Sequence, residues 1–186
     1  MPLHAVLTAL IVLDVILLAG TAALGMTLSD SASIYRHYVL GMAASMFTCF
    51  IHVLVLFYLI GTGKDLRDAV DDAPDLAETY VPLTRRLKRR VFPPACFAIA
   101  LMVVATLMGG EVHSRLLAAD GGRTLPVRGV TAWWVHLLFV VLAFLASAIA
   151  FQAEVAAARE NRKAIETLNA ELARREARGV ASFPSS

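Results

Sequence analysis

The sequence predicts an all-α integral membrane protein, in which four transmembrane helices form a bundle and a charged helix extends the last of them. The 186 residues are 58% hydrophobic, with a mean hydropathy of +0.67, above the apolar share of an ordinary soluble domain. The apolar residues stand in four long blocks, unlike the short periodic faces of a soluble core. The fourth block continues into a segment of mixed charge that lacks Gly and Pro, which is typical of an extended helix.

Each apolar block is long enough to cross a bilayer, because a hydrocarbon core about 30 Å thick needs about 20 helical residues at a rise of about 1.5 Å each. The first block exceeds the about 7–15 apolar residues of a signal peptide and has no Lys or Arg before it, so we expect it to be retained. The third is expected to begin at Pro93, because proline suits the first turn of a helix. The predicted spans are about 5–26, 38–60, 93–110 and 130–151.

The distribution of positive charge predicts the orientation of the spans. Of the 17 Lys and Arg residues, 13 lie in segments 61–92 and 156–178. Segments rich in Lys and Arg stay in the cytoplasm. We therefore expect a multi-pass protein of a membrane such as the bacterial inner membrane, with both termini cytoplasmic. Trp133 and Trp134 then lie at the outer interface, where aromatic residues are enriched.

The predicted cytoplasmic part consists of a loop at 61–92, a charged helix at 156–178 and a flexible tail at 179–186. The loop is acidic at first and ends in a basic run, Arg85–Arg90, whose position favours contact with anionic lipid over binding of nucleic acid. The charged helix has an apolar seam that suits two roles: a coiled coil in a homo-oligomer or a larger membrane complex, or packing on the chain's own loop. The sequence leaves both open. The seam consists of Ala158, Ile165, Leu168 and Leu172.

Three spans place a histidine on a face of small residues. Ionisable residues are costly in a bilayer, so each is a candidate functional residue. Small residues let a neighbouring helix approach closely, and they also leave space for a flat cofactor. The faces are Gly41, Ser45 and Thr48 above His52, Thr106 and Gly110 (or Gly109) before His113, and Val140, Ala143 and Ser147 after His136.

The depths of the histidines favour a cofactor between the helices. His113 and His136 lie at similar depth toward the outer end, so they are the leading axial ligands of a non-covalently bound haem b, with His52 third. A metal ion is the competing cofactor. Its ligands would be His37, His113 and His136, with Glu111 as a fourth.

Asp14 in the first span and His52 in the second lie at similar depth near the middle of the membrane. A hydrogen bond between them would lower the cost of burying either side chain. The sequence therefore predicts an intramembrane polar pair, which would suit a proton or ion pathway.

These candidates favour a small membrane electron-transfer protein that exchanges electrons with quinone or a partner. In outline the chain resembles the small four-helix membrane cytochromes of the b type, which share its span count and intramembrane histidines. A structural or scaffolding membrane subunit, acting through the charged loop and helical tail, is the alternative. The chain lacks a phosphate loop and a Ser-His-Asp constellation, and whether it is an enzyme stays open.

Overall fold

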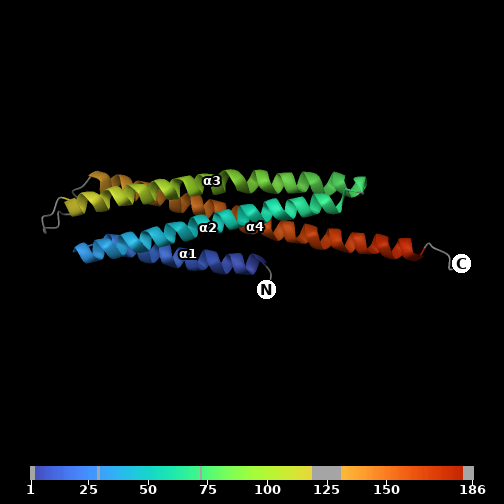
Figure 1. The fold of residues 1–186 in the computed structure, drawn as a ribbon, viewed down its shortest axis with the longest axis horizontal. Helices are drawn as coiled ribbons and strands as arrows, with labels where there is room; N and C mark the ends of the chain where they lie inside the picture. Colours follow the sequence, from blue (N-terminus) through green and yellow to red (C-terminus); the bar gives the residue numbers. More distant parts are fainter. Residues whose placement is uncertain (1–2, 29, 72, 119–130, 182–186) are drawn as a thin grey trace.

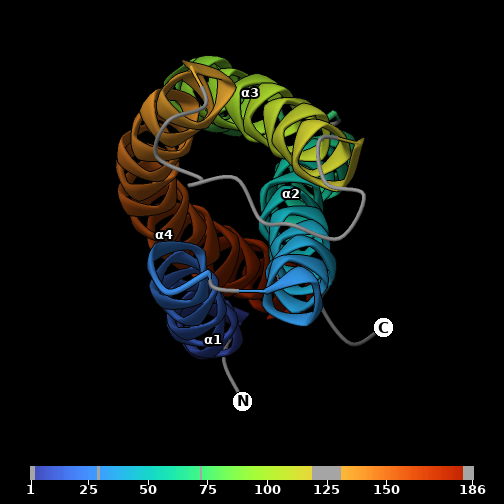
Figure 2. The ribbon, with the colours of Figure 1, turned by 90° about the vertical axis from the view of Figure 1, so that its left-hand side faces the viewer.

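The computed structural model describes residues 3–28, 30–71, 73–118 and 131–181, and these residues form four helices (Figure 1). Viewed along the bundle, the helices follow one another around a ring, so that α2 and α4 face each other across it (Figure 2). The helices are α1 (Leu3–Met26), α2 (Ser31–Ala69), α3 (Pro74–Ala118) and α4 (Thr131–Ala181). Most of the predicted flexible tail, 182–186, and residue 130 lie outside the described residues.

The core of the bundle follows alternating spacings of three and four residues, which is the pattern of helices that pack as in a left-handed coiled coil. Helix α4 illustrates the pattern between positions 143 and 168. Its buried residues there include a line at this spacing, formed by Ala143, Ser147, Ala150, Glu154, Ala157, Asn161, Ala164 and Leu168. Polar residues therefore return to the core at every seventh position, at 147, 154 and 161.

The surface of the four-helix part is apolar. Large side chains point away from the bundle and are mostly exposed, with exposed fractions of 71% for Met46, 67% for Phe57 and 63% for Ile149. Soluble monomers rarely expose so much contiguous apolar surface. The prediction of four helices long and apolar enough to span a membrane is confirmed, and the fold fits a multi-pass membrane protein.

The segment 61–92, which was predicted to be a loop, is helical apart from a short turn. Helix α2 continues to Ala69 and α3 begins at Pro74, so Pro93 lies inside a helix and does not start one. Hydropathy locates the apolar part of a helix but not its ends. Beyond that part, the helices continue because residues such as Tyr80 and Leu87 still bury one face while the charged residues face outward.

Helices α2, α3 and α4 extend beyond the N-terminal end of α1, which lies alongside only one half of the assembly (Figure 1). In this three-helix extension, Leu168 and Ala164 of α4 pack against Leu66 and Tyr80. Ile165 and Leu172 are partly buried against the same cluster. The apolar seam of the charged helix is therefore covered by the chain's own α2–α3 hairpin.

Candidate functional site

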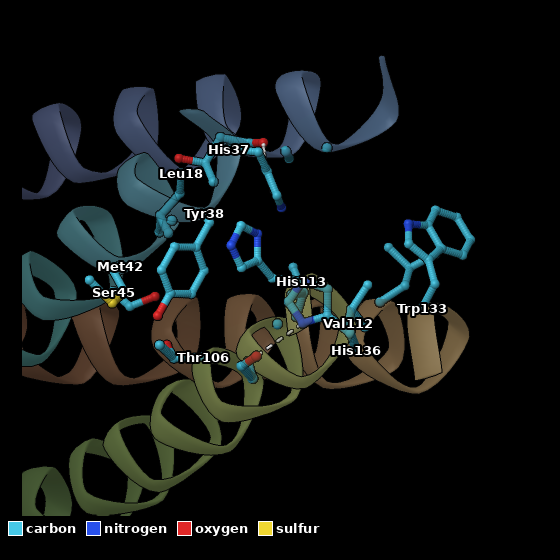
Figure 3. Close-up of a pocket in the computed structure, with 18 of the residues that line it drawn as sticks. Leu18, His37, Tyr38, Met42, Ser45, Thr106, Val112, His113, Trp133 and His136 are labelled. Atoms are coloured by element: carbon cyan, nitrogen blue, oxygen red, sulfur yellow. Dashed lines mark hydrogen bonds between the residues drawn. The ribbon is translucent and has the colours of Figure 1, made fainter. Parts of the chain in front are cut away.

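A cavity of about 160 Å³ lies between the helices at the end of the bundle where α2 and α4 begin, here called the Trp133 end. It brings together three of the histidines predicted to bind a cofactor, His37, His113 and His136 (Figure 3). His52 and Glu111 do not line it. The fold thus groups the outer histidines, as their depths predicted, and separates them from His52.

His37 of α2 lies against α1 at a glycine. Its Nδ1 is 2.9 Å from the carbonyl oxygen of Thr21. Gly25 stands four residues later, one turn along the same face of α1. A Cβ at Gly25 would lie 2.7 Å from Cε1 of His37, which is closer than non-bonded atoms approach. The imidazole therefore occupies the space that a side chain at position 25 would need.

His136 of α4 is held against α3 in the same way. Its Nδ1 is 3.0 Å from the carbonyl oxygen of Ala105, and Gly109 follows four residues later. A Cβ at Gly109 would lie 3.0 Å from Cε1 of His136. The hairpins α1–α2 and α3–α4 thus use one arrangement: an imidazole over a glycine, bonded to the carbonyl one turn earlier.

This arrangement determines which nitrogen carries the proton in each neutral ring. A backbone carbonyl can only accept a hydrogen bond, so Nδ1–H of His37 and of His136 must be the donor. Nε2 of each ring then keeps its lone pair. The centroids of the two rings are 6.5 Å apart, with an angle of 76° between the ring planes. The cavity therefore holds two lone-pair nitrogens that suit a cation or a hydrogen-bond donor.

The third imidazole, His113, is stacked on Tyr38, with ring centroids 4.5 Å apart and an interplanar angle of 15°. Within the described part of the chain, its buried Nδ1 has no hydrogen-bond partner. Both rings line the cavity (Figure 3). His113 thus provides a further polar atom that is available to a ligand.

Glu111 does not complete a four-ligand metal site. Its carboxylate accepts a hydrogen bond from Nε of Arg115, 2.6 Å away on the exposed side of α3. The residues that the structure describes contain no group of three or more His, Cys, Asp or Glu side chains placed to hold a metal ion. The protein ligands available at the cavity are therefore the imidazoles and softer donors such as methionine sulfur.

A second polar centre lies further along the same helices. Nδ1 of His52 is 2.7 Å from Oε1 of Glu154, and both side chains are fully buried. Nε2 of His52 is 3.4 Å from the hydroxyl of Ser147, and the ring stacks on Phe151 with centroids 4.5 Å apart. Because both ring nitrogens have partners, His52 is not free to be a haem ligand.

Asp14 joins this centre from α1. Its Oδ1 lies 2.8 Å from the hydroxyl of Thr48, one turn from His52 on α2. The predicted polar residues therefore share one buried layer, but the hydrogen bonds of Asp14 and of His52 go to other residues. The predicted hydrogen bond between Asp14 and His52 is therefore not formed. The reason is the orientation of α2, which turns Thr48 toward α1 and His52 toward α4.

Sequence reasoning missed Glu154 because this residue lies between the predicted end of the fourth span, at 151, and the charged helix predicted at 156–178. The signal that identifies it is the seven-residue spacing of Ser147, Glu154 and Asn161, which places all three on one face of α4. Asn161 extends the polar line, since its amide nitrogen lies 3.1 Å from the hydroxyl of Tyr58 and 2.9 Å from that of Thr62.

No protein-family model matches this chain, and comparison with curated proteins and with solved structures finds no similar protein. The geometry of the two polar centres therefore provides the basis for a proposed function.

Proposed function

We propose that this protein is a membrane-embedded electron-transfer protein that binds a transition-metal ion between His37 of α2 and His136 of α4. The observation that supports it most is the matched pair of imidazoles. A metal–imidazole bond is about 2.0–2.1 Å long, and the centre of the ring lies about 1.1 Å beyond the bonded nitrogen. Two imidazoles on opposite sides of one ion therefore have ring centroids about 6.4 Å apart. The observed separation is 6.5 Å.

The hydrogen bonds on the far side of each ring support the same assignment. Histidines that bind metals usually donate their other N–H to a carboxylate or a backbone carbonyl, which fixes the tautomer and the orientation of the ring. His37 and His136 do so through the carbonyls of Thr21 and Ala105. The two ligands are thus oriented before any ion arrives.

The cavity favours copper among the transition metals. Among the described residues, its lining contains no carboxylate and no cysteine, but it includes the thioethers of Met42 and Met102. Thioether ligands select Cu(I), and imidazole binds copper as well. A singly charged ion is also less costly to bury among neutral ligands than a doubly charged one.

Haem b, the cofactor first expected from the sequence, could also be bound by two opposed imidazoles such as His37 and His136. The cavity beside them is small for a porphyrin. A cavity of about 160 Å³ is close in size to an engineered cavity that binds benzene, and it is smaller than the about 300–1,000 Å³ of most ligand pockets. A porphyrin would also have to displace the stacked rings of Tyr38 and His113. The described side chains therefore fit an ion better than a haem.

The proposal includes a position in the membrane. The excess of Lys and Arg in segments 61–92 and 156–178 favours a cytoplasmic three-helix extension. The Trp133 end, with the metal site, would then lie in the outer half of the bilayer. There, electrons could be exchanged with a quinone or a partner protein. The scaffolding alternative and assembly into an oligomer or larger complex stay predictions.

Metal analysis and spectroscopy of the full-length protein, purified in mild detergent, test the proposal. We expect stoichiometric copper whose oxidised form shows nitrogen hyperfine coupling in its electron paramagnetic resonance spectrum. His37→Ala and His136→Ala should both lose the metal. Glu111→Gln, on the exposed side of α3, is the matched control and should keep it. A Soret band that shifts on dithionite reduction would identify haem instead, and absence of both metal and Soret band would end the proposal.

A further inference from the structure

Three ionisable side chains lie in one buried layer in the middle of the bundle, away from the proposed metal site. Asp14, His52 and Glu154 are each 0% exposed. The groups that face them from α3 are apolar, since Val91, Ala95 and Ala98 are buried there. The other titratable group nearby is the thiol of Cys49 on α2, which is half-buried. No basic residue other than His52 compensates the two carboxyl groups in the described core.

The hydrogen bonds of Thr48 indicate the protonation state of Asp14. The Thr48 hydroxyl lies 2.8 Å from Oδ1 of Asp14 and 3.0 Å from the carbonyl oxygen of Ala44. A hydroxyl has one hydrogen to donate, and a carbonyl can only accept. An ionised Asp14 would have to share the single Thr48 hydrogen with the Ala44 carbonyl in a three-centre bond. A protonated Asp14 that donates to Thr48 gives each contact a hydrogen of its own, so the geometry favours a protonated carboxyl group at Asp14.

Glu154 and His52 can share one further proton. The contact of 2.7 Å between Oε1 and Nδ1 is satisfied with the proton on either atom. The remaining oxygens, Oδ2 of Asp14 and Oε2 of Glu154, are buried and have no partner among the described residues. An ionised carboxylate with an unpartnered oxygen is costly in the core, and binding a proton removes that cost.

We propose that Asp14, His52 and Glu154 form a proton-binding site in the middle of the bundle, in which Asp14 is a neutral acid in the resting protein. The ligand is a proton because the three side chains are not placed to coordinate a metal ion. None of them lines the cavity at the Trp133 end. The site uses none of the residues of the metal centre.

The surroundings of the site determine from which end protons reach it. Toward the Trp133 end, it is separated from the cavity by a buried apolar cluster of Leu18, Ala44, Met102, Ala105 and Ala143. In the opposite direction, buried apolar residues such as Val55, Leu59 and Ala157 also pack around the site, but here a polar line on α4 continues from Glu154 to Asn161. There the Asn161 amide meets the hydroxyls of Tyr58 and Thr62. Protons therefore exchange through the end that carries the three-helix extension.

Infrared spectroscopy of the full-length protein in lipid nanodiscs, with ¹³C-labelled aspartate, tests the resting state. We expect a protonated carboxylic C=O band at neutral pH that disappears in Asp14→Asn and persists in Asp30→Asn, whose side chain is an exposed helix cap. Asn can donate to Thr48 as the neutral acid does, so Asp14→Asn should also keep the wild-type melting temperature. A wild-type spectrum in which every labelled aspartate is ionised at neutral pH would overturn the proposal, whatever the variants do.

The side of access is tested with oriented proteoliposomes. We expect the C=O band of Asp14 to shift when D₂O is added on the side of the C-terminal extension, and Asn161→Leu to slow this exchange several-fold. Thr167→Val, an exposed position further along α4, should leave the exchange rate unchanged. Exchange only from the Trp133 side, or at equal rates from both sides, would contradict the assigned route.

Discussion

The two polar centres are built from the same helices but are organised in opposite ways. At the Trp133 end, His37 and His136 each have one bonded nitrogen and one free nitrogen beside a cavity. About 22 Å further along α2, His52 has partners on both nitrogens and its ring stacks on Phe151. The difference supports the proposals made above, of a bound ion at the first centre and of a bound proton at the second.

The cause of this difference is the size of the residues around each ring. Gly25 and Gly109 allow the imidazoles of His37 and His136 to lie against a neighbouring helix, and the cavity lies beside them. His52 is packed against Phe151 instead, so the ring itself fills the core. Three experiments, taken from the largest expected effect to the smallest, test this comparison.

Removal of one member of the buried pair should have the largest effect on stability. Glu154→Ala leaves His52 without its main partner, and loss of one partner of a buried ionic pair typically costs about 3–5 kcal/mol. Replacement of both residues by leucine should cost much less, because no unpaired polar group remains. Unfolding midpoints in detergent measure both variants. Glu160→Ala, a surface position on the same helix, is the control, and equal losses in single and double variants would show that the pair is not coupled.

At the metal centre, Gly25→Ala should lower metal affinity more than stability. The new methyl group would lie 2.7 Å from Cε1 of His37 and would turn the ring out of position. Loss of a group that orients a metal ligand typically lowers affinity about 10–100-fold. Copper titration of the purified variant measures this effect. Gly20→Ala on the same helix, where a Cβ meets nothing within 4 Å, should bind copper normally, and an unchanged affinity for Gly25→Ala would refute the assigned role of Gly25.

An exposed ion pair outside both centres should have the smallest effect. In the three-helix extension, Asp75 accepts hydrogen bonds from Arg175 at 3.2 and 2.5 Å, and this guanidinium lowers the pKa of the Asp75 carboxyl. The pair therefore contributes above the usual pKa range of aspartate, and the contribution disappears as the pH falls through the lowered pKa. Asp75→Asn should change the unfolding midpoint slightly at neutral pH and not at all in strong acid. A larger change in acid than at neutral pH would reverse the expected sign.

Hydropathy and helix periodicity, which are local properties, were enough to predict four apolar helices and the grouping of the outer histidines. Depth along a straight helix is a simple function of residue number, so His37, His113 and His136 could be expected at one level. The helical structure of segment 61–92 could not be predicted in this way, because it depends on the burial of Tyr80 and Leu87 against other helices.

By itself, then, the sequence determined the class of fold and the depth of each polar side chain. The tertiary structure alone decided which side chains meet. Glu154 is separated from His52 by 102 positions, and their contact depends on the rotation of α2 and α4 about their axes. That rotation is set by the packing of every buried residue along both helices, so no short stretch of sequence contains it. The same packing turned Asp14 toward Thr48 and placed two imidazoles over two glycines.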